Sequence, residues 1–186
     1  WYITRVHTKV TKTIYVLCLF SMIVPFQMVM FTMSKVANML SLDNPIGLIV
    51  LYLGFGAGLS IFMFSGFVKS IPIDIEEAAL IDGCNPIKTF FLIVLPLLKP
   101  ICITVAILNV MWIWNDYLLP FLVLETSDFK TITLEIYYVK MTAGQYVSPW
   151  ETLFPSVLIA ILPLIVIFLL FQKHFVKGVT AGAVKS

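Results

Sequence analysis

Carboxylate side chains are concentrated in one polar stretch, IPIDIEEAALIDGCNPIK, which lies between long apolar segments. The stretch holds four acids and no base before its last residue: Asp74, Glu76, Glu77 and Asp82. A short acidic helix with small side chains can approach a partner closely and bind in a groove on its surface. An amphipathic helix lying on a bilayer is the alternative, but such helices usually carry Lys and Arg on their polar side.

Other residues that could carry chemistry are scattered. His7 and His174 flank the apolar segments without a cluster of acids or cysteines, which does not favour a protease or metal site. The three cysteines lack CxxC spacing and are interpreted as small buried side chains: Cys18, Cys84 and Cys102. The sequence contains no P-loop, so any ATP hydrolysis must come from another polypeptide. We expect no catalytic residue, no metal, no cofactor and no nucleic acid partner.

The polar stretch itself predicts a helix, a tight turn and a second helix. Pro72 suits a first turn, where the following acids meet the positive end of the helix dipole, so we expect a helix from about Pro72 to Asp82. Its spacing places Ile75, Ala78 and Ala79 on one narrow apolar side. Gly83 can adopt the left-handed conformation that ends the helix.

The second helix has its own start and stop signals. Asn85 can cap it and Pro86 fits its first position. We expect it to run from Ile87 to about Leu95 and to stop near Pro96 and Pro100.

The rest of the chain is too apolar for a soluble protein. Its residues are 60% hydrophobic and 12% charged, with a mean hydropathy of +1.01, so lipid must be part of its solvent. We therefore predict an all-α, polytopic transmembrane helical bundle. The segments expected to span the membrane, each near the length that a hydrocarbon core of about 30 Å requires, are 13–34, 44–68, 100–124 and 152–172.

The basic residues indicate an orientation. With a cytoplasmic start, four crossings place nine of the 12 Lys and Arg residues on the cytoplasmic side, three in each of its three segments. The hairpin at about 70–99 and the tail 173–186 are then cytoplasmic. The segment 125–151 is external, and we expect a short helix within it.

Helix breakers inside the spans indicate packing between helices. Pro25, Pro155 and Pro163 are tolerated in apolar helices when neighbouring helices satisfy the freed carbonyls. Gly54 and Gly58 form a GxxxG pattern, which favours close helix packing over a phosphate-binding loop.

One acid lies inside a predicted span. Asp116 follows Lys99 by 17 residues, which places it about 25 Å along a helix, near the outer boundary. It is a candidate for substrate passage or outer gating, with simple hydration as the alternative. The neighbouring aromatic residues have two interpretations, an aromatic belt at the membrane boundary or rings that stack on a sugar whose hydroxyls bond to Asn115 and Asp116. These aromatic residues are Trp112, Trp114 and Tyr117.

The polar stretch resembles the EAA-x3-G-x9-I-x-L-P signature of permease subunits from binding-protein-dependent ABC importers. Every fixed position is filled. The resemblance implies that the residues coupling the chain to an ATPase are Glu76, Glu77, Ala78, Ala79, Asp82, Gly83, Ile93, Leu95 and Pro96. Within this set, Glu77 and Gly83 correspond to the glutamate and glycine that matter for coupling in the family.

The remainder is similar to the carbohydrate-uptake branch, namely the smaller maltose-type permease subunit, through IPIDIEEAALIDG, the WND at 114–116 and the tail QKHFVKGVTAGAVKS. Such subunits usually have six spans. The chain starts at Trp1 and lacks the first two, so we interpret it as an N-terminally truncated permease fold.

The resemblance implies a set of partners. These are a second permease subunit, a cytoplasmic ABC ATPase dimer that the tail reaches between, an extracytoplasmic substrate-binding protein, membrane lipid and a sugar substrate. Two alternatives stay open: an ABC importer for a peptide, amino acid or ion, and an ion-coupled secondary transporter, whose usual inverted repeat and midplane acids we do not detect.

Overall fold

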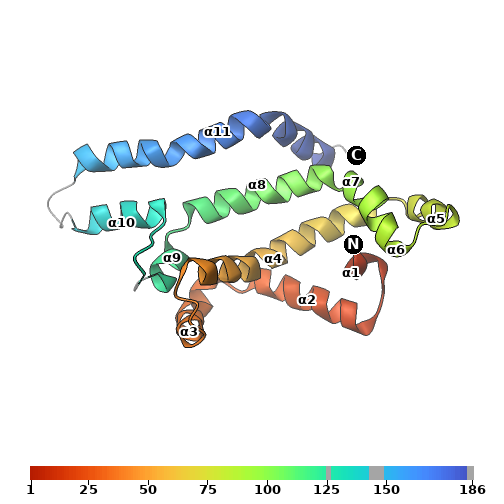
Figure 1. The fold of residues 1–186 in the computed structure, drawn as a ribbon, viewed down its shortest axis with the longest axis horizontal. Coiled ribbons are helices and arrows are strands. Elements are labelled where there is room, and N and C mark those ends of the chain that lie inside the picture. The colour runs from red at the N-terminus through yellow and green to blue at the C-terminus, as the bar shows by residue number, and fades with distance from the viewer. Residues whose placement is uncertain (125–126, 143–148, 184–186) are drawn as a thin grey trace. The chain divides into compact units, whose positions relative to one another are not determined.

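The chain folds into helices, drawn in Figure 1. The computed structural model describes residues 1–124, 127–142 and 149–183, and beyond residue 170 it describes the backbone alone. The described part contains no strand, in agreement with the all-α prediction. The predicted external segment includes 125–126 and 143–148, and the predicted tail includes 184–186, all of which lie outside the described residues.

Among the residues that the structure describes, two helices are long and apolar enough to cross a membrane, namely α4 (Pro45–Ser70) and the part Trp150–Leu170 of α11 (Trp150–Ala183). Two helix pairs qualify only if each is one bent span: α2 (Lys9–Ile23) with α3 (Phe26–Met39), and Pro86–Leu97 with α8 (Lys99–Asn115).

Two of the predicted spans are interrupted. The span 13–34 is not one helix, because α2 ends at Ile23 and Pro25 is the N-cap of α3. Proline has no N–H to donate and disfavours the helical conformation of Val24 before it, so our interpretation of Pro25 as a tolerated interior proline is wrong. The span 100–124 is interrupted after Asn115, and α9 (Leu118–Val123) follows.

The C-terminal helix accommodates its prolines. Pro155 and Pro163 both lie inside α11, as predicted, and the helical backbone continues past the predicted span end at 172 to Ala183.

The chain divides into two compact units. Unit 1 contains Trp1–Val24 and Phe55–Leu108, together with the end of α11 from Lys173. Its helices are α1 (Tyr2–Arg5), α2, the second part of α4, α5 (Ile73–Ile81), α6 (Pro86–Lys88), the π-helix η1 (Thr89–Val94), α7 (Leu95–Leu97) and the start of α8.

The core of unit 1 forms where the C-terminal end of α4 packs against η1 and the segment that follows it. Its buried members are Val68, Ile71, Val94 and Leu98, and Trp1 and Phe90 pack against them. Gly58 lies close to α2, since a Cβ there would come within 2.7 Å of the Cys18 carbonyl oxygen. Gly54 has nothing within 4 Å of its Cβ position, so the close approach predicted for the GxxxG pattern occurs at one of its two glycines.

Unit 2 contains Pro25–Gly54 and Asn109–Gln172. The predicted short helix of the external segment is α10 (Ile132–Thr142). Leu119, Val123 and Leu134 are buried in this unit, and the Ser34 hydroxyl of α3 donates to the Leu122 carbonyl of α9 at 3.0 Å.

Candidate functional site

The hairpin that carries most of the predicted site begins with α5. Pro72 is its N-cap, and Asp74 and Glu76 lie in its first turn, near the positive end of the dipole. Gly83 has φ +83, and the N–H groups of Gly83 and Cys84 donate to the carbonyls of Leu80 and Ala79 at 3.1 and 3.0 Å. These two bonds form a Schellman motif, so the predicted helix end is confirmed.

The second half of the hairpin starts and ends where the sequence predicts. Asn85 Oδ1 accepts a hydrogen bond from the Lys88 N–H at 2.8 Å, and Pro86 occupies the first turn. The helix then widens into η1 and continues through α7 to Leu97, so it stops between Pro96 and Pro100, as predicted. A π-helical turn is common where the regular hydrogen-bond ladder is interrupted, and Pro96 has no N–H to offer that ladder.

The two adjacent glutamates of α5 have different environments. Glu76 is 5% exposed, whereas Glu77 is exposed at the surface of unit 1. Ala79 is buried beside Glu76, while Ala78 and Ile75 are exposed, so the predicted apolar side of Ile75, Ala78 and Ala79 is not one continuous exposed surface. The exposed side of α5 carries Glu77 and Ala78 instead.

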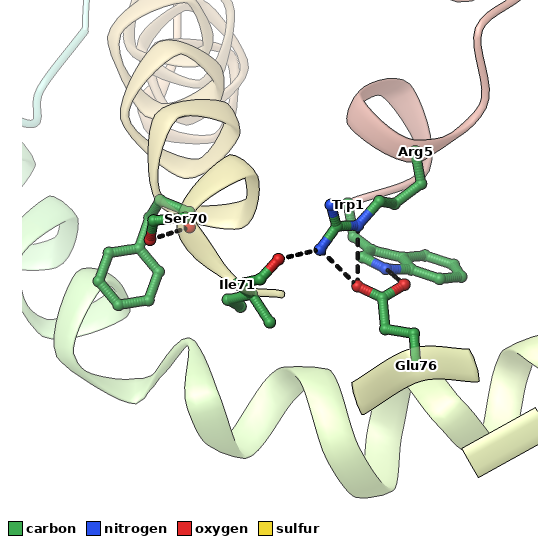
Figure 2. Close-up of polar contacts among 6 residues, drawn as sticks. Trp1, Arg5, Ser70, Ile71 and Glu76 are labelled. Carbon is green, nitrogen blue, oxygen red and sulfur yellow. Dashed lines mark hydrogen bonds and ion pairs between the residues drawn. The ribbon is translucent and has the colours of Figure 1, made fainter. Parts of the chain in front are cut away.

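Glu76 is held by residues far away in the sequence. Arg5 Nη2 lies 2.7 Å from Glu76 Oε1, and Arg5 Nε donates to the same oxygen at 2.8 Å. The Trp1 indole N–H donates to Glu76 Oε2 at 2.9 Å, and Arg5 Nη2 also donates to the Ile71 carbonyl at 2.8 Å. Figure 2 shows the guanidinium between that carbonyl and the carboxylate. We call Trp1, Arg5, Ile71 and Glu76 the Glu76 cluster.

The remaining signature residues lie after the turn or at its edge. Asp82 is exposed at the C-cap of α5, Ile93 is half-buried in η1, and Leu95 and Pro96 are exposed in α7. Sequence analysis did not find Arg5 and Trp1. The one available signal was charge, because Arg5 belongs to a basic segment predicted on the same side of the membrane as the acidic hairpin.

The second predicted group lies in unit 2, where α8 ends. Asp116 Oδ1 accepts hydrogen bonds from the N–H groups of Leu118 and Leu119 at 2.9 and 3.4 Å, which satisfies the start of α9. Asp116 Oδ2 accepts a bond from the Tyr52 hydroxyl at 3.0 Å, and the Thr133 hydroxyl donates to the Asp116 carbonyl at 2.8 Å. Tyr52 and Thr133 were not predicted.

The neighbours of Asp116 also make internal contacts. The Trp114 indole N–H donates to the Ala160 carbonyl at 3.0 Å, and the Asn115 amide donates to the Met111 carbonyl at 2.7 Å. The Trp112 ring contacts the edge of Tyr52 with a centroid separation of 5.5 Å. Asn115 is exposed.

Comparison with known proteins identifies one matching family and several similar permease proteins. Residues 2–181 match the family model of the binding-protein-dependent transport system inner membrane component. The chain is 41% identical to a probable starch degradation products transport system permease protein, AmyC, of Thermoanaerobacterium thermosulfurigenes, over 97% of this chain and 65% of that protein.

Two further relatives have related names. The multiple sugar-binding transport system permease protein MsmG of Streptococcus mutans is 36% identical over 95% of this chain and 64% of its own length. The melibiose/raffinose/stachyose import permease protein MelC of Bacillus subtilis is 35% identical over 98% of this chain and 66% of its own length. The chain thus spans somewhat less than two thirds of these curated relatives.

Proposed function

The chain belongs to the family of binding-protein-dependent transport system inner membrane components, and from this premise we propose that it is the permease subunit of an ATP-driven sugar importer. Membership makes it a multi-pass protein of the cell membrane. In our proposal ATP hydrolysis takes place on a separate ATPase dimer. A second permease subunit completes the solute path, and an external binding protein delivers the solute.

The observation that carries the proposal is the filled signature on a hairpin whose outer side is exposed. Glu77, Ala78 and Gly83 are all exposed, whereas their neighbours Glu76 and Ala79 are buried in unit 1. An exposed helix with small side chains, and with an acid that forms no ion pair among the described residues, suits insertion into a groove on the ATPase.

The Glu76 cluster supports a path by which a displacement of α5 is transmitted to the membrane-spanning helices. Arg5 binds both Glu76 in α5 and the carbonyl of Ile71, which directly follows α4. The buried core adds Val68, Val94 and Leu98 to the same connection. Closure of the ATPase would therefore displace α5, the end of α4 and the start of α8 together. Arg5 links α5 to Ile71, and Ile71 belongs to the core against which Ile101 of α8 packs.

The proposed cargo is a sugar. All three relatives described above carry sugar or starch-product transport in their names. In our proposal Trp114, Asn115 and Asp116 lie along the solute path, with the exposed Asn115 amide as the group best placed to bond a hydroxyl. A non-sugar ABC cargo or an ion-coupled transporter is the alternative that the experiments must exclude.

Docking is tested on the exposed side of the hairpin in the full-length protein, by reversing the charge of Glu77 and by adding a charge at Gly83. Glu77→Lys and Gly83→Asp are expected to reduce both co-purification of the ATPase and ATP-dependent uptake by about tenfold or more, since unfavourable charge at an interface readily costs ~1.4 kcal/mol. The matched control is Glu151→Lys, which reverses an exposed acid at the start of α11. Retention of both activities in the Glu77 and Gly83 variants would show that docking does not use this hairpin.

Cargo is tested with a panel of labelled oligosaccharides, peptides and amino acids in proteoliposomes that contain the assembled transporter and its binding protein. We expect uptake of an oligosaccharide that requires ATP. Uptake that persists without the ATPase and is abolished by an ionophore would instead establish ion coupling, and uptake of peptides alone would exclude a sugar.

A further inference from the structure

A cavity of about 510 Å³ lies in unit 1, lined by residues of α1, the start of α2 and the last turns of α4. Three lysines line it: Lys9, Lys12 and Lys69. Among the described residues that line it there is no Asp or Glu. The cavity is therefore a concentration of positive charge that neither the signature nor the Glu76 cluster explains.

The lysines are available to a ligand. The ion pairs found in the described part of the chain, Arg5–Glu76 and Lys130–Glu135, do not involve them. Lys9 lies in the first turn of α2, which has no acidic residue, so the positive end of that helix dipole adds to the charge. Lys69 Nζ lies 5.8 Å from the centre of the Tyr15 ring, which also lines the cavity.

The wall also contains a polar atom without a partner. Thr4 is 9% exposed, and its hydroxyl has no hydrogen-bond partner within the part of the protein that the structure describes. A buried hydroxyl left unpaired is costly and uncommon in folded proteins, and a polar group bound in the cavity would satisfy it.

The place of the cavity along the helices defines the ligand class. Lys69 is in the last turn of α4, a candidate membrane span, so the cavity lies where lipid meets water. Ile3 and the ring of Tyr15 give it an apolar part beside the lysines. Basic pockets at the ends of transmembrane helices bind lipid head groups, whose phosphate pairs with Lys while the glycerol and chains contact apolar side chains.

We propose that this cavity binds the phosphate-bearing head group of an anionic phospholipid. Thr4 precedes Arg5 in α1, so an occupied cavity favours the position of α1 in which Arg5 binds Glu76. The inference concerns the surrounding lipid and does not depend on which solute is carried.

The test uses the purified full-length protein in nanodiscs of phosphatidylcholine with a minor fraction of phosphatidylglycerol, followed by native mass spectrometry of the retained lipid. Replacing the three lysines (Lys9→Gln, Lys12→Gln, Lys69→Gln) is expected to weaken phosphatidylglycerol binding at least tenfold, since each base near the membrane surface adds to the attraction of an anionic lipid. Lys99→Gln, at the start of α8 and outside the cavity wall, is the matched control and is expected to bind like the wild type.

A second arm separates lipid from free phosphate. We expect millimolar inorganic phosphate neither to bind in pure phosphatidylcholine nor to displace phosphatidylglycerol, and displacement would overturn the assignment to lipid. Equal phosphatidylglycerol binding by the triple variant and the wild type would overturn the site. Should the triple variant fail to fold, the single change Lys12→Glu, at an exposed position, gives the same comparison.

Discussion

Glu76 in unit 1 and Asp116 in unit 2 both accept a hydrogen bond from an aromatic side chain far away in the sequence, but they differ in their other partners. The Trp1 indole binds Glu76 at 2.9 Å and the Tyr52 hydroxyl binds Asp116 at 3.0 Å. Glu76 is then paired with the guanidinium of Arg5, whereas Asp116 accepts bonds from the backbone N–H groups of Leu118 and Leu119.

Because of this difference, the carboxylates of Glu76 and Asp116 have different roles in the fold. Glu76 is buried and paired with a permanent cation, so it fixes α5 to the end of α4 and is not available to a partner. Asp116 is half-buried and, among the described residues, is bonded by neutral donors without a basic partner, so no ion pair fixes it. The acid next to Glu76 in sequence, Glu77, is exposed and suits docking.

The largest effect is expected from breaking the ion pair of the Glu76 cluster. Arg5→Ala leaves a carboxylate in a site where the Glu76 side chain is 7% exposed, and a buried charge without its partner costs about 3–5 kcal/mol of unfolding free energy. Chemical denaturation of the protein in detergent micelles measures the change.

The matched control for that variant is Glu135→Gln. It removes the Lys130–Glu135 pair, whose nitrogen and oxygen are 3.7 Å apart and whose side chains are 42% and 58% exposed, so a loss below ~1 kcal/mol is expected. Equal losses for the two variants would mean that Glu76 is not fixed by its partner.

A smaller effect is expected at Asp116. Tyr52→Phe removes one hydrogen bond to a carboxylate that keeps its two backbone donors, which predicts a loss of about 1.5 kcal/mol in the same denaturation experiment. A loss as large as that of Arg5→Ala would erase the distinction between the two acids.

The smallest effect is expected from substituting a glycine in unit 1, and it compares Gly83 at the end of α5 with Gly66 inside α4. Gly83→Ala forces an L-residue into φ +83, although nothing lies within 4 Å of its Cβ position, so we expect a loss of about 1 kcal/mol from backbone strain alone. Gly66→Ala, also with open space but inside α4, is the control and should stabilise by up to ~1 kcal/mol. Thermal unfolding of the two variants distinguishes them by sign.

Local chemistry made the hairpin predictable. Gly83, Asn85 and Pro86 act within five positions of the chain, and each is found in its expected role, whereas Pro72 is one position earlier than expected, at the N-cap of α5. The signature was identified by its resemblance to that of the importer family, and the family match covers its residues.

Contacts between distant residues were not predictable in the same way. The separation of Glu76 from Arg5 is 71 positions, and that of Asp116 from Tyr52 is 64, so no local pattern reveals either pair. The break after Asn115 depends on such contacts, since Asp116 bonds both to α9 and to Tyr52. Pro25 was misread because its effect depends on whether neighbouring helices satisfy the freed carbonyls.

The central claim is that the outer side of α5 faces the cytoplasm and docks on the ATPase. Cys84, half-buried just after Gly83, reports this directly once Cys18 and Cys102 are replaced by alanine. A membrane-impermeant maleimide is added to inside-out and right-side-out vesicles, with and without the ATPase. We predict labelling in inside-out vesicles alone, with protection by the bound ATPase, whereas labelling from the external side would contradict the account.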